Sequence, residues 1–242
     1  MKNNNLNIAV ILAAGMGKRL GKLNKNQPKG MIKIGKSPII KESIEKLLKA
    51  GIKKIFIVTG YKSEVYKKLF ASEKNIEILE NKNFAETNTL YSLSRIEGKI
   101  ENDFLLLESD LIYDYAAIPA IMKDKHENVV LVSNLTGHGD EVFVEAKEDF
   151  LVKMSKNSTI SSEKVYGEFV GINKISLELY KRMMQYFNKS KQKDSLSYEE
   201  DALVNCAKSI KIKCLLLPKF YWSEIDDAEH LKIAKKIYSK IT

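Results

Sequence analysis

Residues 8–29 read IAVILAAGMGKRLGKLNKNQPK, and this stretch decides the fold of the 242-residue chain. It begins with the unbroken apolar run IAVIL, which is typical of a strand buried on both faces of a parallel sheet. Small residues follow from Ala13 to Gly17, where backbone N–H groups can approach a ligand and glycine can adopt a positive φ. Cations come next, at Lys18, Arg19 and Lys29. A strand, a glycine-rich turn and clustered cations indicate a cradle for a polyphosphate.

Two widespread phosphate-binding patterns do not fit this turn. The P-loop requires Gly-Lys-Ser/Thr and the dinucleotide fingerprint requires a third glycine, and neither pattern is present. The alternative interpretation is an ordinary strand-to-helix connection with solvated lysines. Because the chain has 40 lysines and arginines, that alternative stays open for Lys18 or Lys22 taken alone.

The pattern L-A-A-G-x-G-x-R-L at residues 12–20, followed by P-K at residues 28–29, resembles the signature of the sugar-nucleotide pyrophosphorylase-like nucleotidyltransferases. The resemblance implies an enzyme that transfers a nucleotidyl group, with Arg19 and Lys29 as catalytic residues that neutralise phosphate charge. It also implies a nucleotide lying over the glycine-rich turn. The nucleotide-binding residues expected in the turn are Leu12, Ala13, Ala14, Gly15, Met16, Gly17 and Lys18.

Residues 80–93, ENKNFAETNTLYSL, begin as a polar segment and then become helical. Their Asn, Thr and Ser side chains can supply the donors and acceptors that read a pyrimidine edge. The structural alternative is a helix start capped by Thr87 or Asn88, and both interpretations can hold at once. The segment resembles its counterpart in the phosphocholine and 2-aminoethylphosphonate cytidylyltransferases, which implies that Asn88 and Ser92 contact the cytidine nucleotide.

Apolar runs alternate with helical periodicity along the chain. Further strands are expected at residues 55–59, 76–79, 104–110 and 129–133, with shorter ones at 142–144, 151–154 and 168–172. The alternation predicts an α/β fold with a doubly wound, mostly parallel, Rossmann-like sheet whose ligands bind at the carboxyl ends of the strands. The shorter strands predict a small mixed-sheet extension on the acceptor side. We expect a single domain over residues 1–242.

The amino-acid composition indicates which binding partners and which cellular location to expect. The formal net charge is +9, but the lysines are scattered among acidic residues and only three arginines occur, so we expect no nucleic-acid partner. No apolar run approaches the roughly 20 residues of a membrane span, and the polar start predicts a cytoplasmic protein without a membrane partner. Cys206 and Cys214 are expected to be reduced, unpaired core residues.

Carboxylates follow two apolar segments. Asp110 ends the run that starts at Phe104, and a buried carboxylate is costly unless it has a partner, so it could serve as a hard oxygen ligand for Mg²⁺. Its alternative role is to cap the next turn. The stretch Glu224-Ile225-Asp226-Asp227 lies near the C-terminus. The family resemblance implies that Asp110 and Asp226 hold the metal, and Glu224 is a candidate third ligand.

The second half of the chain offers groups for an acceptor. Lys156 could hold a phosphonate, while Asp140, Glu168 and Glu200 could face an ammonium. Charged residues of this kind lie more often at the surface, and Glu200 also suits the start of a helix.

Aromatic residues offer a different acceptor site. Tyr91, Tyr221 and Trp222 could build a cage for a trimethylammonium group. The proposed chemistry needs no base, so His138 is not expected to act, and His126 and His230 are expected at the surface.

The motifs at residues 139–142, 154–156, 167–172 and 224–227 resemble those of bacterial 2-aminoethylphosphonate cytidylyltransferases. The resemblance implies transfer of CMP from CTP to 2-aminoethylphosphonate, with Mg²⁺ and with release of pyrophosphate. The alternatives are an enzyme for phosphocholine, one for a sugar 1-phosphate with another nucleotide, and a non-enzymatic nucleotide- or nucleic-acid-binding module.

Overall fold

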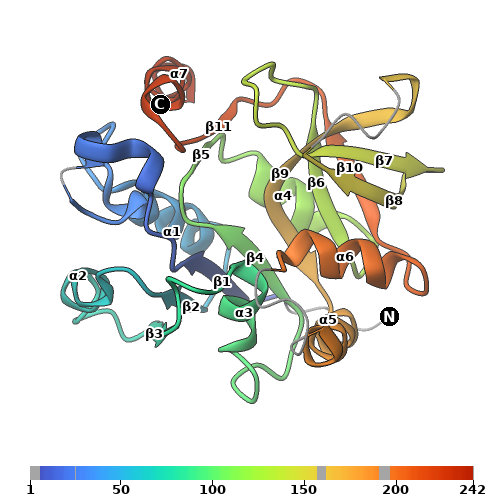
Figure 1. Cartoon of the computed structure of the whole chain (residues 1–242), viewed down its shortest axis with the longest axis horizontal. Coiled ribbons are helices and arrows are strands. Elements are labelled where there is room, and N and C mark those ends of the chain that lie inside the picture. Colours follow the sequence, from blue (N-terminus) through green and yellow to red (C-terminus); the bar gives the residue numbers. More distant parts are fainter. Residues whose placement is uncertain (1–5, 25, 157–161, 191–196, 242) are drawn as a thin grey trace.

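The computed structural model describes residues 6–24, 26–156, 162–190 and 197–241. Their main feature is a nine-stranded sheet in the order β3-β2-β1-β4-β9-β6-β10-β8-β7 (Figure 1). The strands are β1 (Ile8–Ala13), β2 (Lys54–Thr59), β3 (Ile76–Glu80), β4 (Phe104–Glu108), β6 (Val129–Ser133), β7 (Phe143–Lys147), β8 (Phe150–Ser155), β9 (Val165–Ile175) and β10 (Lys213–Leu217). Strands β3, β2, β1 and β4 run parallel, as do β6 and β10. The predicted α/β fold is confirmed.

The apolar run of β1 is buried on both faces of the sheet. Val10 and Leu12 pack into one core, whereas Ala9, Ile11 and Ala13 pack into the other, because successive side chains of a strand point to opposite faces. Helices α3 (Thr89–Ser94), α5 (Leu177–Ser190) and α6 (Glu199–Ala207) contribute to the first core. Helices α1 (Ile39–Lys49), α2 (Ser63–Leu69) and α4 (Ala117–Lys123) contribute to the second. Helices therefore cover both faces, which is why every residue of this run is apolar.

Strand β9 corrects one prediction. The sequence indicated a short strand at residues 168–172 in a peripheral extension, but β9 spans Val165–Ile175 and lies in the middle of the sheet, antiparallel to β4 and β6. Polar residues hid its length: Asn173 and Lys174 are buried within it, and the Lys174 ammonium donates a 3.0 Å hydrogen bond to the carbonyl oxygen of Asp124. The mixed extension consists of β7 and β8, with β7 also pairing with the first part of β9.

A short antiparallel ribbon joins two distant parts of the chain. Strand β5 (Leu111–Tyr113) pairs with β11 (Trp222–Glu224), and the Ile225 N–H donates a 3.1 Å hydrogen bond to the carbonyl oxygen of Asp110. Helix α7 (Ala228–Ile241) follows and packs through Ala234. The ribbon brings the segment after β4 beside the segment before α7.

Cys206 and Cys214 are buried and unpaired, as expected. Within the described ranges, no helix has the length and apolar character that a membrane crossing would need.

Candidate active site

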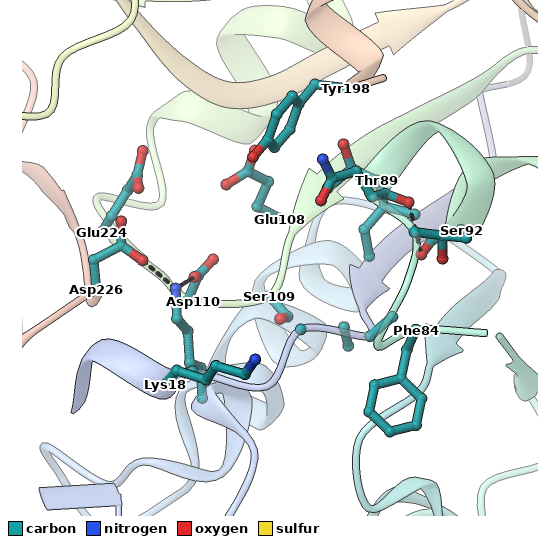
Figure 2. Close-up of a pocket in the computed structure, with 18 of the residues that line it drawn as sticks. Lys18, Phe84, Thr89, Ser92, Glu108, Ser109, Asp110, Tyr198, Glu224 and Asp226 are labelled. Atoms are coloured by element: carbon teal, nitrogen blue, oxygen red, sulfur yellow. Dashed lines mark hydrogen bonds and ion pairs between the residues drawn. The ribbon is translucent and has the colours of Figure 1, made fainter. Parts of the chain in front are cut away.

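A cleft of about 320 Å³ opens at the carboxyl ends of β1 and β4 (Figure 2). It gathers most of the residues selected from the sequence. Those that line it are Leu12, Ala13, Ala14, Gly15, Gly17, Lys18, Arg19, Lys29, Asn88, Ser92, Asp110, Lys156, Glu200, Glu224 and Asp226. Six selected residues are missing from the described lining: Met16, Tyr91, Asp140, Glu168, Tyr221 and Trp222.

The glycine-rich turn forms one wall of the cleft. Gly17 has a φ of 61°, a conformation that favours glycine, and the chain turns there into the 3-10 segment Lys18–Asn24. Leu20 anchors this segment in the small core that also contains Ile225. A Cβ atom at Gly15 would have nothing within 4 Å, so the backbone is open to the cleft at this point. Such an open, anchored backbone suits the close approach of a phosphate.

Four charged side chains meet beside this turn. The Lys29 Nζ atom lies 2.7 Å from Oδ2 of Asp110 and also donates to Oδ1 of Asp226. The Arg19 guanidinium donates to the other carboxylate oxygen of Asp226. Burial favours the neutral amine, but the two carboxylates outweigh it and raise the pKa of Lys29 above its ordinary value, so the ammonium stays charged.

Asp110 and Asp226 are suited to hold a divalent cation. Their side chains come from different ends of the chain, yet both contact the same ammonium, and in Figure 2 they point toward each other. Burial alone would raise the pKa of Asp226, but Lys29 and Arg19 lower it below its ordinary value, so Asp226 is ionised at neutral pH. Two converging carboxylates supply the hard oxygen ligands that Mg²⁺ prefers.

One end of the cleft, next to Asp226, is rich in carboxylates. Glu108, Glu200 and Glu224 line it together with Lys156. Burial, with Glu224 and other nearby carboxylates, holds the pKa of Glu108 well above its ordinary value. Burial, Asp110 and Asp226 raise the pKa of Glu224 to about 8. Burial alone would lower the pKa of Lys156, but Glu200, Glu224 and Glu108 raise it, so this end holds more acidic groups than its one lysine can neutralise.

Glu108 was not selected from the sequence. It ends β4 two residues before Asp110, and Gly171 on β9 makes room for it. A Cβ atom at Gly171, whose φ is +78°, would lie 3.2 Å from the Glu108 Cδ atom. The sequence did carry a signal for Glu108, the order Glu-Ser-Asp at the end of the apolar run. Alternate residues of a strand point the same way, so a cleft that contains Asp110 is expected to contain Glu108 as well.

The polar residues around the start of α3 form another wall of the cleft. Thr87, Asn88, Thr89 and Ser92 all line the cleft. Buried Asn81 donates a 3.1 Å hydrogen bond to the Ser92 hydroxyl and holds it in place. Asn88 occupies the N-cap position of α3 without a capping hydrogen bond from its side chain, so the cap alternative is not supported for this residue.

The predicted aromatic cage does not form. Tyr91 packs edge-on against Phe187, and Tyr221 is exposed beside the Lys240 ammonium. Trp222 is buried and donates a 2.8 Å hydrogen bond to the Ser133 hydroxyl. Tyr91 lies on a different element, α3. Tyr221 directly precedes β11 and Trp222 begins it, and adjacent residues of an extended chain point to opposite sides.

One aromatic ring that was not selected does line the cleft. Tyr198 precedes α6, on the same side as Glu108 in Figure 2, and the Lys156 Nζ atom lies 5.6 Å from its ring centroid.

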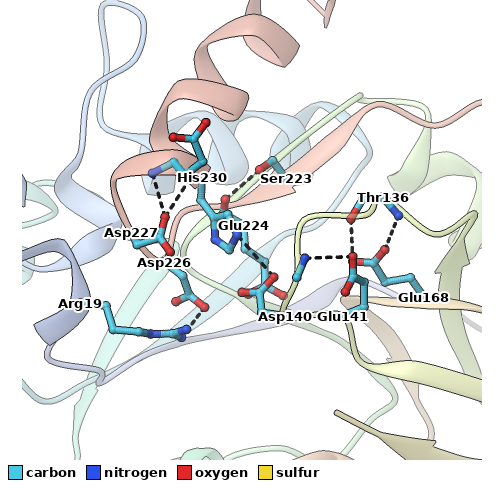
Figure 3. A network of polar contacts seen from close by, with 12 residues as sticks. Arg19, Thr136, Asp140, Glu141, Glu168, Ser223, Glu224, Asp226, Asp227 and His230 are labelled. Carbon is cyan, nitrogen blue, oxygen red and sulfur yellow. Dashed lines mark hydrogen bonds and ion pairs between the residues drawn. The ribbon is translucent and has the colours of Figure 1, made fainter. Parts of the chain in front are cut away.

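Asp140 and Glu168 lie beside the cleft rather than along it. Glu168 is buried and accepts hydrogen bonds from the Thr136 N–H at 2.7 Å and the Thr136 hydroxyl at 3.1 Å (Figure 3). Its pKa is raised to about 7, chiefly by burial. Asp140 faces His230, which is only 5% exposed, so the expectation that His230 is a surface residue was wrong. Residues of other segments, among them Asp140 and His138, lie around the imidazole, and the periodicity of a helix cannot show which distant neighbours bury a side chain.

A comparison with protein families fits this geometry. Residues 8–141 match the family described as Nucleotidyl transferase. That match covers more than half of the chain and contains the glycine-rich turn, Lys29 and Asp110. The chain belongs to the nucleotidyl transferase family.

Individual relatives narrow the comparison. The chain is 27% identical over 234 residues to the bifunctional IPC transferase and DIPP synthase of Aquifex aeolicus, covering 96% of this chain and 52% of that protein. It is 33% identical over 99 residues to the choline-phosphate cytidylyltransferase of Streptococcus pneumoniae, covering 40% and 42% of the two chains. The matched part spans about half the length of these curated relatives.

A solved structure supports the fold. The inositol-1-phosphate CTP transferase from T. maritima superposes with a TM-score of 0.83 at 21% identity, covering 98% of this chain and 96% of that one. The similarity extends over β7, β8 and the C-terminal segment, which lie outside residues 8–141. The whole architecture is therefore that of a Rossmann-like nucleotidyltransferase.

Proposed function

We propose that this chain is a cytidylyltransferase that transfers CMP from CTP to a small phosphonate- or phosphate-bearing amine and releases pyrophosphate. The observation that carries the proposal is the Lys29 ammonium, which contacts both Asp110 and Asp226 beside an open glycine-rich turn. These cations and carboxylates, gathered beside the glycine-rich turn, support the binding of a triphosphate in the cleft. The names of the relatives, a choline-phosphate cytidylyltransferase and a CTP transferase, support CTP as the nucleotide.

The proposed reaction is an in-line displacement. An oxygen of the acceptor's phosphonate or phosphate forms a bond to the α-phosphorus of CTP. The bond between that phosphorus and the oxygen bridging to the β-phosphate breaks, and its electron pair leaves with pyrophosphate. The attacking oxygen is already anionic near neutral pH, so Lys29 and Arg19 act by positioning the phosphates and neutralising their charge. A Mg²⁺ ion held by Asp110 and Asp226 would supply further charge neutralisation.

The acidic end of the cleft supports an amine on the acceptor. Glu108, Glu200 and Glu224 surround a single lysine, Lys156, so a second cation would relieve the excess of buried acid. A primary ammonium donates three hydrogen bonds and favours carboxylates, whereas a trimethylammonium favours an aromatic cage. Among the described residues at this end, Tyr198 supplies a single aromatic ring, whereas a cage needs several. We therefore favour 2-aminoethylphosphonate over phosphocholine as the acceptor, with Lys156 near the phosphonate.

The alternative functions require different side chains in the cleft. A sugar 1-phosphate would need neutral groups that read hydroxyls, where this chain offers carboxylates. Phosphocholine remains the second candidate, supported by the choline-phosphate cytidylyltransferase among the relatives. A binding module without activity would not need carboxylates from two distant segments to converge on one ammonium.

The test is pyrophosphate release by the purified chain with Mg²⁺, using CTP, UTP, ATP or GTP and a panel of phosphorylated amines. We expect CTP to be preferred by a wide margin, with UTP the nearest competitor. In a second assay, CTP is supplied together with 2-aminoethylphosphonate and phosphocholine at equal concentration. The nucleotidyl product of 2-aminoethylphosphonate should then dominate. Equal rates with purine nucleotides would refute the nucleotide assignment, and a dominant CDP-choline product would refute the acceptor.

A further inference from the structure

A second group of metal-binding side chains lies next to the cleft. Asp140, Asp226 and His230 each offer a ligand atom, and these atoms lie within 4.8 Å of one another. Figure 3 shows the three side chains converging from the loop before β7, the segment after β11 and the start of α7. We call them the Asp140–His230 cluster. The cluster shares Asp226 with the pair of carboxylates assigned to Mg²⁺, but its other two members, Asp140 and His230, lie outside that pair.

Hydrogen bonds to the backbone at the start of α7 hold His230 in place. The Asp227 carboxylate accepts hydrogen bonds from the N–H groups of Glu229 at 2.8 Å and His230 at 3.0 Å. These bonds cap the start of the 14-residue helix α7 and satisfy backbone donors that the helix leaves unpaired. The imidazole is therefore presented from the first turn of a helix anchored by its side chains in the small core.

The imidazole turns its Nε2 atom toward the carboxylates of the cluster. Its Nε2 atom lies 3.4 Å from the Asp140 Oδ1 atom, and its Nδ1 atom is buried with no hydrogen-bond partner among the described residues. The residue is 5% exposed, and a buried polar atom without a partner is unusual in a folded protein. The ring of His138 lies 6.0 Å away between centroids.

A small cavity adjoins these groups. His138, Asp140, Glu168, Glu224 and His230 help to line it, and its volume of about 10 Å³ is near the least that one water molecule occupies. The space therefore suits a single water or ion and excludes an organic ligand.

We propose that the Asp140–His230 cluster binds a borderline divalent cation such as Zn²⁺. One imidazole nitrogen with two carboxylate oxygens is a zinc-type ligand set, unlike the all-oxygen set that Mg²⁺ favours. Bonds of about 2.0–2.2 Å to each ligand can bridge these atoms after small side-chain rotations. Asp226 can contribute while it also contacts Arg19 and Lys29, because an ionised carboxylate has about four lone-pair sites.

The experiment is a calorimetric titration of the full chain with Zn²⁺ in excess Mg²⁺, which occupies hard oxygen sites. Wild type should bind one Zn²⁺ per chain, and ¹⁵N spectra of the imidazoles should show the His230 ring nitrogens shifting on saturation. His230→Gln and Asp140→Asn should each weaken binding at least about tenfold, since even indirect partners of metal ligands have effects of that size. Asp110→Asn should leave the Zn²⁺ affinity unchanged.

The matched control is His126→Gln. His126 also contacts an aspartate, with Nδ1 2.7 Å from the Asp124 Oδ1 atom, but lies outside the cluster, so its loss should not change Zn²⁺ binding. Asp140 is on a loop and partly exposed, so Asp140→Asn tests the site even if His230→Gln disturbs packing. No Zn²⁺ uptake by wild type, or equal affinity in wild type and in folded Asp140→Asn, would overturn the proposal.

Discussion

The Lys29 ammonium lies 2.7 Å from the Asp110 carboxylate, although 81 residues separate the two positions in the chain. Both side chains are mostly buried, with 18% and 13% of their surface exposed. The same ammonium contacts Asp226, which is 197 residues away from Lys29. One lysine, in the segment that follows the glycine-rich turn, thus joins the end of β4 and the C-terminal segment at a single point.

Replacing Lys29 should remove most of the catalysis. We expect Lys29→Met to lower kcat about 10²–10³-fold, the usual cost of losing a donor that stabilises developing charge. The measurement is pyrophosphate release from CTP at saturating substrates. Lys33→Ala is the matched control, because Lys33 is exposed in the same segment. Loss of activity in the control but not in Lys29→Met would contradict the role of Lys29.

Asp110→Asn should nearly abolish turnover while leaving the fold intact. The substitution keeps the shape of the side chain but removes the charge that would hold a divalent cation. A chelator should abolish wild-type turnover, and added Mg²⁺ should restore it. Asp114→Asn is the control, since Asp114 caps the Ala116 N–H and asparagine caps equally well. Near-wild-type rates of Asp110→Asn at saturating Mg²⁺ would refute the metal assignment.

Glu200→Gln should weaken binding of the acceptor and leave binding of the nucleotide unchanged. If Glu200 accepts a hydrogen bond from the acceptor's ammonium, the KM for 2-aminoethylphosphonate should rise about tenfold or more, with little change in the KM for CTP. Wild type should also prefer this acceptor over ethylphosphonate, which lacks the amine, and the variant should narrow that preference. Glu178→Gln, on an exposed face of α5, should behave as wild type. An unchanged preference in Glu200→Gln would exclude this contact.

Glu168 should make stability depend on pH. Its pKa is raised from 4.5 to about 7, so between those values the folded state binds more protons than the unfolded state. The contribution of Glu168 is therefore fully present below about pH 4.5 and is lost as pH rises through about 7. Relative to wild type, Glu168→Gln should gain stability from pH 5 to pH 8, by about 1–3 kcal/mol.

Urea unfolding at a series of pH values measures this difference. Glu163→Gln serves as the control, because Glu163 is exposed just before β9 and should leave the profile unchanged. Parallel pH profiles of wild type and Glu168→Gln would show that the Glu168 carboxyl does not titrate as described.

Several features could be predicted from the sequence because their signals are local. An apolar run that ends in small residues specifies a doubly buried strand followed by an open turn, and β1 with Gly15 and Gly17 has that form. Carboxylates at strand ends meet at one edge of a parallel sheet, which is why Asp110 could be selected without coordinates. Family motifs extended the same reasoning to Lys29 and Asp226, and all of these residues line one cleft.

Other features were decided by long-range pairing. Strands β5 and β11 have three residues each, too few for a periodic signal, yet their register sets where Trp222 and Asp226 lie. The aromatic cage was therefore misassigned, because residues close in sequence point apart on a strand. Glu108 and Tyr198 enter the cleft only once β4, β9 and α6 are packed together.

The burial of charged groups could not be predicted from the sequence, whereas the local features could. The sequence by itself determined the parallel strands around β1, the turn and the types of side chain available to a nucleotide. Only the tertiary structure decided that His230 is buried beside Asp140 and that Glu168 is buried against Thr136. A residue's type sets the cost of burying it, but the neighbours that compensate that cost come from distant segments and are known only after the chain has folded.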